Sequence, residues 1–108
     1  MNEKKRVAGN TTVASDVLET IVIMTVTDTK GVSKLFNSSA APNGIKLKIS
    51  DNKVNADIYV NLKAEGTTTV EVCGQIQQRI ARAVKEMVGM EVGQLNIHVE
   101  DFDYEEAK

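Results

Sequence analysis

Histidine and cysteine, two of the side chains that most often take part in catalysis and metal binding, each occur once in this sequence. His98 is the only histidine and Cys73 is the only cysteine. A histidine needs a second group placed beside it to act as a general base or to hold a metal, and no such partner stands near His98 in the sequence. Cys73 falls in the first turn of a predicted helix, where a thiol pKa can be lowered, but also on its apolar side, where cysteine packs as a small hydrophobic residue. We therefore expect no catalytic, cofactor-binding or metal-binding residue. A small enzyme or redox protein that uses Cys73 or His98 is the weakest alternative.

The chain lacks the short motifs of phosphate and nucleic-acid chemistry. It has no P-loop, no G-x-S-x-G elbow and no Cys/His metal pattern. It has no G-x-x-G of the kind that KH modules need, and only Tyr59 is placed like the aromatic platforms of RRM sheets. Arg79, Arg82 and Lys85 form a basic strip on one predicted helix, and residues 4–6 add three basic side chains. A small nucleic-acid-binding regulator is therefore the main alternative, although a net charge of -2 gives no general attraction to nucleic acid.

Length and composition indicate a small domain of ordinary make-up. With 108 residues, of which 42% are hydrophobic, the chain can bury one core. We expect a flexible N-terminal tail at 1–10, a single domain at 11–102 and an acidic C-terminal tail at 103–108. No run approaches the roughly 18 apolar residues of a membrane helix, and no signal-peptide pattern follows the charged N-terminus. The single cysteine excludes an internal disulfide, so we expect a cytoplasmic protein without direct membrane insertion.

A long helix is the element around which the predicted fold is arranged. Thr68 and Glu71 have the S/T-x-x-E spacing of a capping box, in which each side chain satisfies a free amide at the helix start. Gly89 follows the last apolar turn, where a residue with positive φ commonly ends a helix. We therefore predict a helix at about 69–88. Its apolar residues recur at steps of three and four and should share one face: Cys73, Ile76, Ile80, Val84 and Met87.

A shorter helix is predicted at 15–28. Ser15 is a favourable N-cap, and Asp16 and Glu19 add acidic side chains in the first turn. Residues 20–27 are mostly β-branched and favour a strand on propensity, but the helical periodicity is the stronger guide. The predicted buried face consists of Val17, Leu18, Ile21 and either Met24 or Thr25.

Two alternating segments before the long helix predict a β-hairpin. Apolar residues occupy every second position in 45–49 and 54–62, so each strand has one buried and one solvated face. A two-residue turn at Asp51-Asn52 would set the register of the two strands. It would pair Ile49 with Val54, Leu47 with Ala56, Ile45 with Ile58, and Lys46 with Asp57 on the outer face.

Further strands complete the pattern. Residues 32–36 predict a short strand, residues 95–99 alternate as a final strand, and residues 11–13 are a candidate for another short one. Residues 37–44 hold the only proline and predict a loop. The order (β)-α-β-β-β-α-β predicts an α+β fold, a two-layer sandwich with two helices packed on one face of a small mixed sheet.

The sheet face that no helix covers is the candidate functional surface. Its predicted residues are Lys46, Lys48, Asp57, Tyr59, Asn61, Asn96 and His98. This face is either ordinary solvated surface or a contact surface. Tyr59 and His98 are ring side chains among polar ones, and aromatic residues are enriched at interfaces. The acidic tail, with Phe102 and Tyr104, is the second candidate contact region.

An ordered set of short segments runs through the whole domain. The segments are Asp16-Val17, Ile21, Lys30-Gly31-Val32, residues 57–62, Gly66, Val70-Glu71-Val72, Ile76-Gln77, Ala83-Val84, residues 87–92 and residues 95–99. This set resembles the alkaline-shock protein family, small stress-linked proteins of Gram-positive bacteria, over residues 11–102. Val70 stands where family members often have a proline, and Glu65 stands where many have an aromatic residue. These departures leave the subgroup, and with it the partner, open.

The resemblance implies a cytoplasmic, non-enzymatic protein of the stress response and cell-envelope homeostasis. It implies action through protein contacts, often by self-association and sometimes beside the membrane through a membrane-anchored partner protein. It brings no catalytic residue and no cofactor. The identity of the partner, the stress signal and the oligomeric state stay open.

Overall fold

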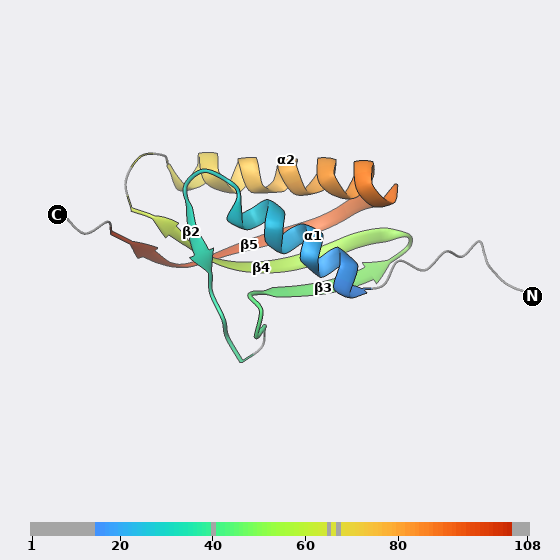
Figure 1. The fold of residues 1–108 in the computed structure, drawn as a ribbon, viewed down its shortest axis with the longest axis horizontal. Helices are drawn as coiled ribbons and strands as arrows, with labels where there is room; N and C mark the ends of the chain where they lie inside the picture. Colours follow the sequence, from blue (N-terminus) through green and yellow to red (C-terminus); the bar gives the residue numbers. More distant parts are fainter. Residues whose placement is uncertain (1–14, 40, 65, 67, 105–108) are drawn as a thin grey trace, which may run out of the picture.

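The structure, a computed structural model, describes residues 15–39, 41–64, 66 and 68–104. Along these residues the elements are α1 (Ser15–Thr27), β2 (Val32–Leu35), β3 (Ile45–Ser50), β4 (Lys53–Lys63), α2 (Thr69–Val88) and β5 (Glu91–Asp103), as Figure 1 shows. The predicted order of these helices and strands is confirmed. The tail predicted at 1–10 and the short strand predicted at 11–13 lie outside the described residues.

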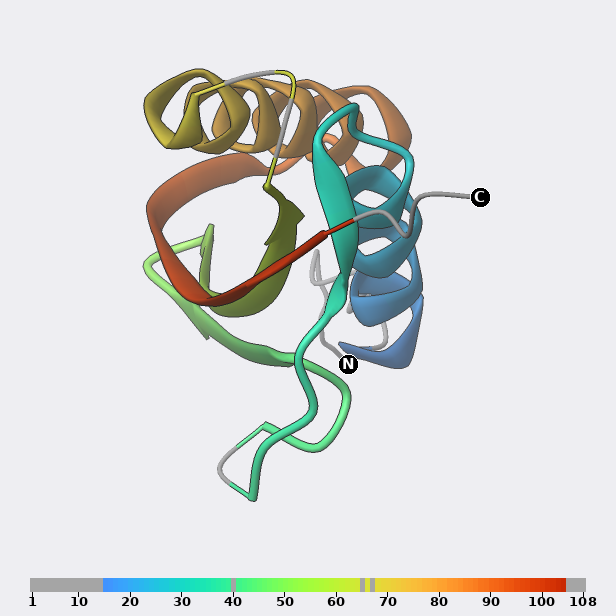
Figure 2. The ribbon, with the colours of Figure 1, turned by 90° about the vertical axis from the view of Figure 1, so that its left-hand side faces the viewer.

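The strands form one mixed sheet with β4 at its centre. β3 and β2 pair antiparallel with β4, β3 over residues 53–58 and β2 over residues 60–62. β5 runs parallel to β4 along the opposite edge, from Lys53↔Glu91 to Lys63↔Asp103. The sheet is strongly curled, with α2 above its concave side and α1 beside it (Figure 2). The fold is therefore the predicted two-layer α+β sandwich.

The hairpin has the predicted register. Ile49 pairs with Val54, and Lys46 pairs with Asp57. Asp51 and Asn52 form the turn with φ of 54° and 62°. Positive φ at both central residues is the type I′ pattern, whose twist matches that of the two strands.

Both ends of α2 follow the predicted signals. The Thr68 hydroxyl accepts a hydrogen bond from the Glu71 amide, and the Glu71 carboxylate accepts one from the Thr68 amide, each at 3.2 Å. Gly89 ends the helix with φ of 72°, and its amide donates to the Lys85 carbonyl. The capping box and the left-handed glycine together satisfy backbone groups that a helix otherwise leaves unpaired.

The buried stripe of α2 was predicted only in part. Its buried residues are Val72, Ile76, Ile80 and Val84. Cys73 is half-buried and Met87 is 68% exposed, so the prediction was wrong in placing these two on the buried face. Steps of four rotate the stripe by about 40° each, so Cys73 and Met87 both fall within its angular span, and the helical period alone does not distinguish them from the buried residues. Met87 lies in the last turn, where it lines the open groove between the helices.

α1 is confirmed as a helix, but its buried face differs from the predicted one. Its buried residues are Leu18, Val22 and Val26. Val17 is 47% exposed, so the predicted face was wrong at this position. Of the two alternatives Met24 and Thr25, Met24 is 64% exposed and Thr25 is half-buried. Nearly every residue from 17 to 26 is apolar or β-branched, and the sequence therefore offered several equivalent faces. Packing against α2, β2 and β3 selects one of them.

The β-branched threonines of α1 fit the helix because their hydroxyls have partners within it. The hydroxyl of Thr20 donates to the Asp16 carbonyl at 2.9 Å, and that of Thr25 donates to the Ile21 carbonyl at 2.7 Å. Such bonds to the carbonyl four residues earlier satisfy the hydroxyl without breaking the helix. The strand preference of this segment is therefore overridden.

The core joins α2 to the centre of the sheet, and a substitution of the core residue Ile76 tests this packing. Ile76 and Ile58 are both fully buried. We expect Ile76→Ala to lower the free energy of unfolding by about 2–5 kcal/mol, through lost burial and the cavity left behind. Val70 on the same helix is 82% exposed, so Val70→Ala is the matched control and should cost no more than about 0.5 kcal/mol. Urea unfolding followed by circular dichroism measures both, and equal losses would contradict this packing.

Candidate interaction surface

The parallel pairing of β4 with β5 assembles the centre of the polar sheet face. The register sets Asp57 beside Asn96 and Tyr59 beside His98. These four predicted residues are thus brought together from positions about forty apart in the sequence. The sequence carried a signal for this, because a strand, a long helix and a second strand commonly form a parallel crossover.

The rings of Tyr59 and His98 stack on each other. Their centroids are 4.4 Å apart and their planes are inclined by 12°. Nε2–H of His98 donates to the Asp57 carboxylate at 3.1 Å, and the Asn96 side-chain amide donates to the same oxygen at 3.0 Å. Gln94 extends this network, since its side-chain amide donates to the side-chain oxygen of Asn96 at 3.3 Å. The result is a stacked ring pair whose orientation is set by a carboxylate.

The network also sets the charge state of Asp57. The hydrogen bond from His98 is the largest cause that lowers the pKa of Asp57 below 3.8, and the bond from Asn96 is the second. The positive charge of Lys46, which pairs with Asp57 in the register, acts in the same direction. Asp57 is therefore an anion throughout the neutral range.

A shallow hollow lies beside this network, over the hairpin. It has a volume of about 540 Å³. Its polar lining consists of Lys46, Lys48, Ser50, Asn55, Asp57, Gln94 and Asn96. The lysines are exposed and come from β3, whereas Gln94 and Asn96 come from β5. This end of the face therefore combines two exposed cations with side-chain amide groups that are held by hydrogen bonds.

Asn61 lies on the same side of β4 but is buried, with 5% exposure. The Ser33 hydroxyl of β2 donates to the Asp103 carboxylate of β5 at 2.6 Å, and the Asn61 amide donates weakly to the same carboxylate at 3.5 Å. The Ser33 bond is also the main cause that lowers the pKa of Asp103. Asn61 is thus covered and is left out of the contact surface. Sequence reasoning missed the Ser33–Asp103 link, because nothing in the sequence showed that β2 and β5 flank the same end of β4.

Phe102 and Tyr104 do not join the ring pair. The register shifts after Val60↔Val99, so that Asn61 pairs with Asp101 and Leu62 pairs with Phe102. This irregularity inserts Glu100 and reverses the alternation, as a β-bulge does. Phe102, at 44% exposure, therefore shares the face of Leu62 rather than that of His98, and Tyr104 follows β5 at 76% exposure. No sequence signal marked this bulge.

The two residues of reactive type, His98 and Cys73, lie in different layers of the fold. Nε2 of His98 is engaged with Asp57, and its ring face is covered by Tyr59. Cys73 lies on α2, across the sheet from His98, and burial raises its thiol pKa. Within the described part of the chain, no group of three or more histidine, cysteine or acidic side chains could hold a metal ion.

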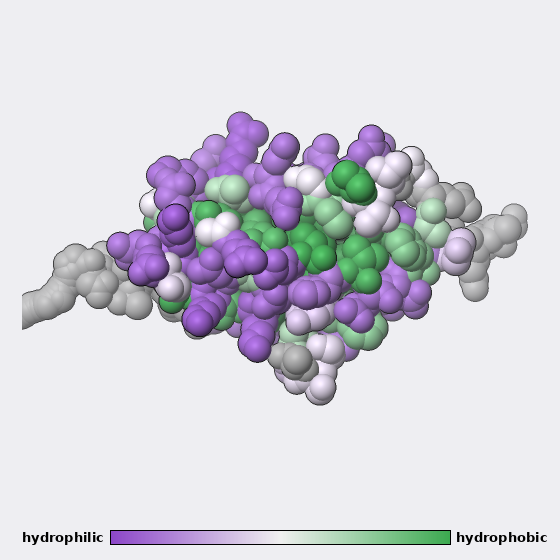
Figure 3. All heavy atoms as spheres, turned by 180° about the vertical axis from the view of Figure 1, so that it is seen from behind, coloured by the Kyte–Doolittle hydropathy of each residue, from purple (hydrophilic) through white to green (hydrophobic). Residues whose placement is uncertain are grey.

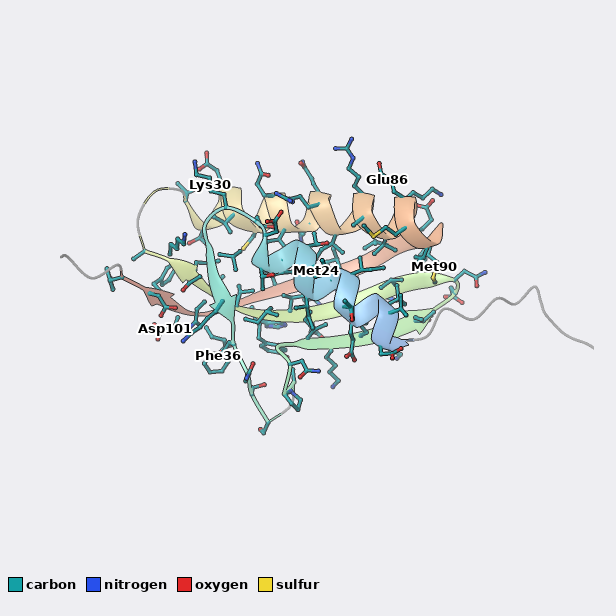
Figure 4. The ribbon with its side chains drawn as sticks, viewed as in Figure 1. Met24, Lys30, Phe36, Glu86, Met90 and Asp101 are labelled. Atoms are coloured by element: carbon teal, nitrogen blue, oxygen red, sulfur yellow. The ribbon has the colours of Figure 1, made fainter. Side chains whose placement is uncertain are left out.

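A larger open groove, of about 960 Å³, lies between α1 and α2. Met24 lines it from α1 and Glu86 lines it from α2 (Figure 4). Its basic residues have acidic partners, because Arg79 contacts Asp28 at 2.9 Å and Arg82 contacts Glu86 at 3.3 Å. The groove therefore has exposed apolar side chains and locally balanced charge.

Asp57 should make the stability of the sheet face depend on pH. Its lowered pKa means that the ionised carboxylate stabilises the folded state above pH 3.8, and that this contribution is lost as the pH falls through the lowered pKa. We expect Asp57→Asn to lower the free energy of unfolding near neutral pH by about 0.2–1 kcal/mol, the range of exposed cross-strand pairs. Urea unfolding measured from neutral pH to below pH 3.8 should show that the loss of unfolding free energy becomes smaller at low pH. When His98 is already replaced by alanine, Asp57→Asn should lower the unfolding free energy by less. A loss that does not depend on pH would contradict the stabilising role of the ionised Asp57 carboxylate.

The thiol of Cys73 should react slowly with thiol reagents. Because burial raises its pKa, the reactive thiolate is scarce near neutral pH. We expect the folded protein to react with a chromogenic disulfide reagent more slowly than the same protein in denaturant, by about tenfold or more. Fast reaction of the folded protein would instead favour a redox role for this residue.

Solved structures with a similar fold carry different sequences. The copper form of the MamM CTD superposes with a TM-score of 0.62 and 12% identity, covering 86% of this chain and 91% of that chain. A histidine-to-glutamate variant of the same CTD gives a TM-score of 0.63 at 12% identity, covering 82% and 96%. These similarities show the fold alone. Among the described residues, no helix is long and apolar enough to cross a membrane.

Sequence comparison supplies the family. The chain is 33% identical over 101 residues to the uncharacterized protein Spy1535 of Streptococcus pyogenes serotype M6, covering 85% of this chain and 78% of that protein. Residues 3–104 match the model of the alkaline-shock protein 23 family, described as having a cell envelope-related function. The resemblance expected from the sequence is confirmed: this chain belongs to the alkaline-shock protein 23 family.

Proposed function

We propose that this protein is a non-enzymatic module of the stress response and cell-envelope homeostasis that works by binding other proteins. The family has a cell envelope-related function, which sets the general role. The contact surface that we propose, termed the ring face, consists of Lys46, Lys48, Asp57, Tyr59, Asn96 and His98. In this proposal the protein stays in the cytoplasm and reaches the membrane only through a membrane-anchored partner.

The observation that carries this proposal is the stacked pair of Tyr59 and His98. Both rings are half-buried on a sheet face that neither helix covers. Asp57 holds His98, so the pair presents its ring surface in one orientation. A preset aromatic side chain loses little conformational entropy when a partner covers it, and this is why such residues dominate many interfaces.

The charges around the pair favour an orientation for the partner. Lys46 and Lys48 lie at the hairpin end of the ring face, while Asp101 and Asp103 follow the bulge at the other end. A partner with acidic groups at one end and basic groups at the other would be aligned by this pattern. Such rim charges contribute more to specificity and association rate than to affinity.

The basic strip of α2 gives no support to the alternative that this protein is a nucleic-acid-binding regulator. Each of its cations is paired with a carboxylate: Arg79 with Asp28, Arg82 with Glu86, and Lys85 with Glu91. Phosphate binding relies on cations that can exchange counterions for phosphates. The paired strip is therefore a weak candidate for this role.

The test is capture of partners from extracts of the host by the tagged protein, with Tyr59→Ala/His98→Ala as the variant. We expect the variant to lose, by about tenfold or more, a protein that the wild type retains at high salt. Met24→Ala/Met87→Ala is the matched control, since it removes two exposed side chains from the groove on the other side of the molecule. The captured protein must then bind purified wild-type chain.

Three outcomes would overturn the proposal. One is equal capture by the wild type and the ring-face variant. Another is loss of the partner only in the methionine variant, which would move the contact to the groove. The third is RNA retained at low salt and released at high salt, which would favour the nucleic-acid alternative.

A further inference from the structure

β5 forms an edge of the sheet. Among the described strands it pairs only with β4, and it is the longest of them at 13 residues. Figure 1 draws β5 on the far side of the molecule, and Figure 3, seen from behind, shows a band of apolar surface along the middle with polar side chains above and below. The half-buried apolar residues of this strand are Val92, Leu95, Ile97 and Val99. A long apolar edge strand is a template for pairing with another chain.

The hydrogen bonds of β4 show which peptide groups of β5 face outward. The Tyr59 amide donates to the Gly44 carbonyl next to β3, so the peptide groups of Ile58 and Val60 face β5. In the parallel register these groups bond to Asn96 and His98. The N–H and C=O groups of Leu95, Ile97 and Val99 therefore point to the free edge.

The regular part of this edge is self-complementary. The register with β4 is unbroken from Leu95 to Val99, with irregularities on both sides. An antiparallel copy related by a two-fold axis through Ile97 would place Leu95 opposite Val99 of the second copy. It would also place Asn96 opposite His98 of the second copy, and Ile97 opposite itself. Apolar residues thus meet apolar ones, and polar residues meet polar ones.

The charges of β5 are compatible with the same pairing. The segment from 92 to 99 has no acidic or lysine side chain, and all four acids of the strand lie outside it. In this register Glu100 lies opposite Gln94 of the second copy, not opposite an acid. Glu91 would come near Asp103 of the second copy, but Glu91 is already paired with Lys85 at 2.6 Å. A Lys-rich edge strand, which commonly prevents such pairing, is absent from this segment.

Two residues of α2 lie next to this edge. The Gln77 side-chain amide donates to the Leu95 carbonyl at 3.3 Å, and so occupies one outward acceptor. Gly74, three residues earlier, shares that flank of the helix. An added Cβ at Gly74 would meet nothing within 4 Å, so the monomer does not need this glycine, a residue type that is unfavourable in a helix interior. The glycine leaves room for an approaching second copy.

We propose that a second copy of this chain pairs with β5 through its free edge, antiparallel about a two-fold axis at Ile97. The three outward residues of each copy would form about six backbone hydrogen bonds, with Gln77 turning away from Leu95. This deepens the proposed function, on which it rests: the edge joins two copies, and the ring faces stay open for other proteins. The dimer therefore presents two ring faces on one continuous sheet.

Hydrogen–deuterium exchange of the wild type against protein concentration tests the pairing directly. The amides of Leu95, Ile97 and Val99 should become protected as concentration rises, by about tenfold when nine in ten chains are paired. The amides of Asn96 and His98, bonded to β4, should be protected at every concentration. Sedimentation should show a monomer passing to a dimer. A chain that stays monomeric at its solubility limit, or that associates without protecting these three amides, overturns the proposal.

Substitutions on different strands distinguish the role of the β5 edge in dimerisation from that of the ring face. Ile97→Lys should weaken the dimer by at least about tenfold, since it sets two lysines opposite each other at the axis. Ile49→Lys is the matched control on β3, where Ile49 is 46% exposed, and it should dimerise like the wild type. Tyr59→Ala removes a ring-face side chain from β4 and leaves every residue of the β5 edge in place, so it should also keep the dimer. Dimer loss in Tyr59→Ala overturns the edge pairing, whereas loss of an outside partner with the dimer intact bears only on the proposed function.

Discussion

The whole structure depends on β4 being hydrogen-bonded along both of its edges. Its apolar residues Val54, Ile58, Val60 and Leu62 are almost completely buried. That burial is possible only because β3 and β2 pair with one edge while β5 pairs with the other. Unpaired peptide groups in such a buried strand would each cost about 1–3 kcal/mol. The helices then cover the apolar face that this central strand creates.

The same pairing creates the ring face. Asp57 and Tyr59 alternate with buried residues of β4, and so they point away from the helices. The parallel register then brings Asn96 and His98 beside them, where the stack and the shared carboxylate become possible. A shift of β5 by one residue would turn His98 into the core and destroy the pair. The site is therefore a consequence of strand register, not of any local motif.

The two surfaces that we propose differ in kind. The ring face relies on side chains whose orientation is fixed, so it can select a partner by shape and charge. The β5 edge relies on backbone groups, whose bonding pattern is the same in any strand, and its selectivity comes from the alternation and charge of the residues between the two irregularities. The bulge at Glu100 is a common boundary of both surfaces, because it ends the regular edge and turns Phe102 away from the ring face.

Local chemistry in the sequence was sufficient to determine the elements, their order, the caps of α2 and the hairpin register. The Thr68–Glu71 box, the Gly89 stop and the alternation from 45 to 62 act over a few residues, and no distant contact needed to be known. Tertiary structure decided which faces of the helices are buried, because residues 17–26 offer several apolar faces and only packing distinguishes them. It also decided the burial of Asn61, the bulge at Glu100 and the register of β5 on β4 that sets Asp57 within reach of His98. These features depend on contacts between residues far apart in the chain, which no local pattern records.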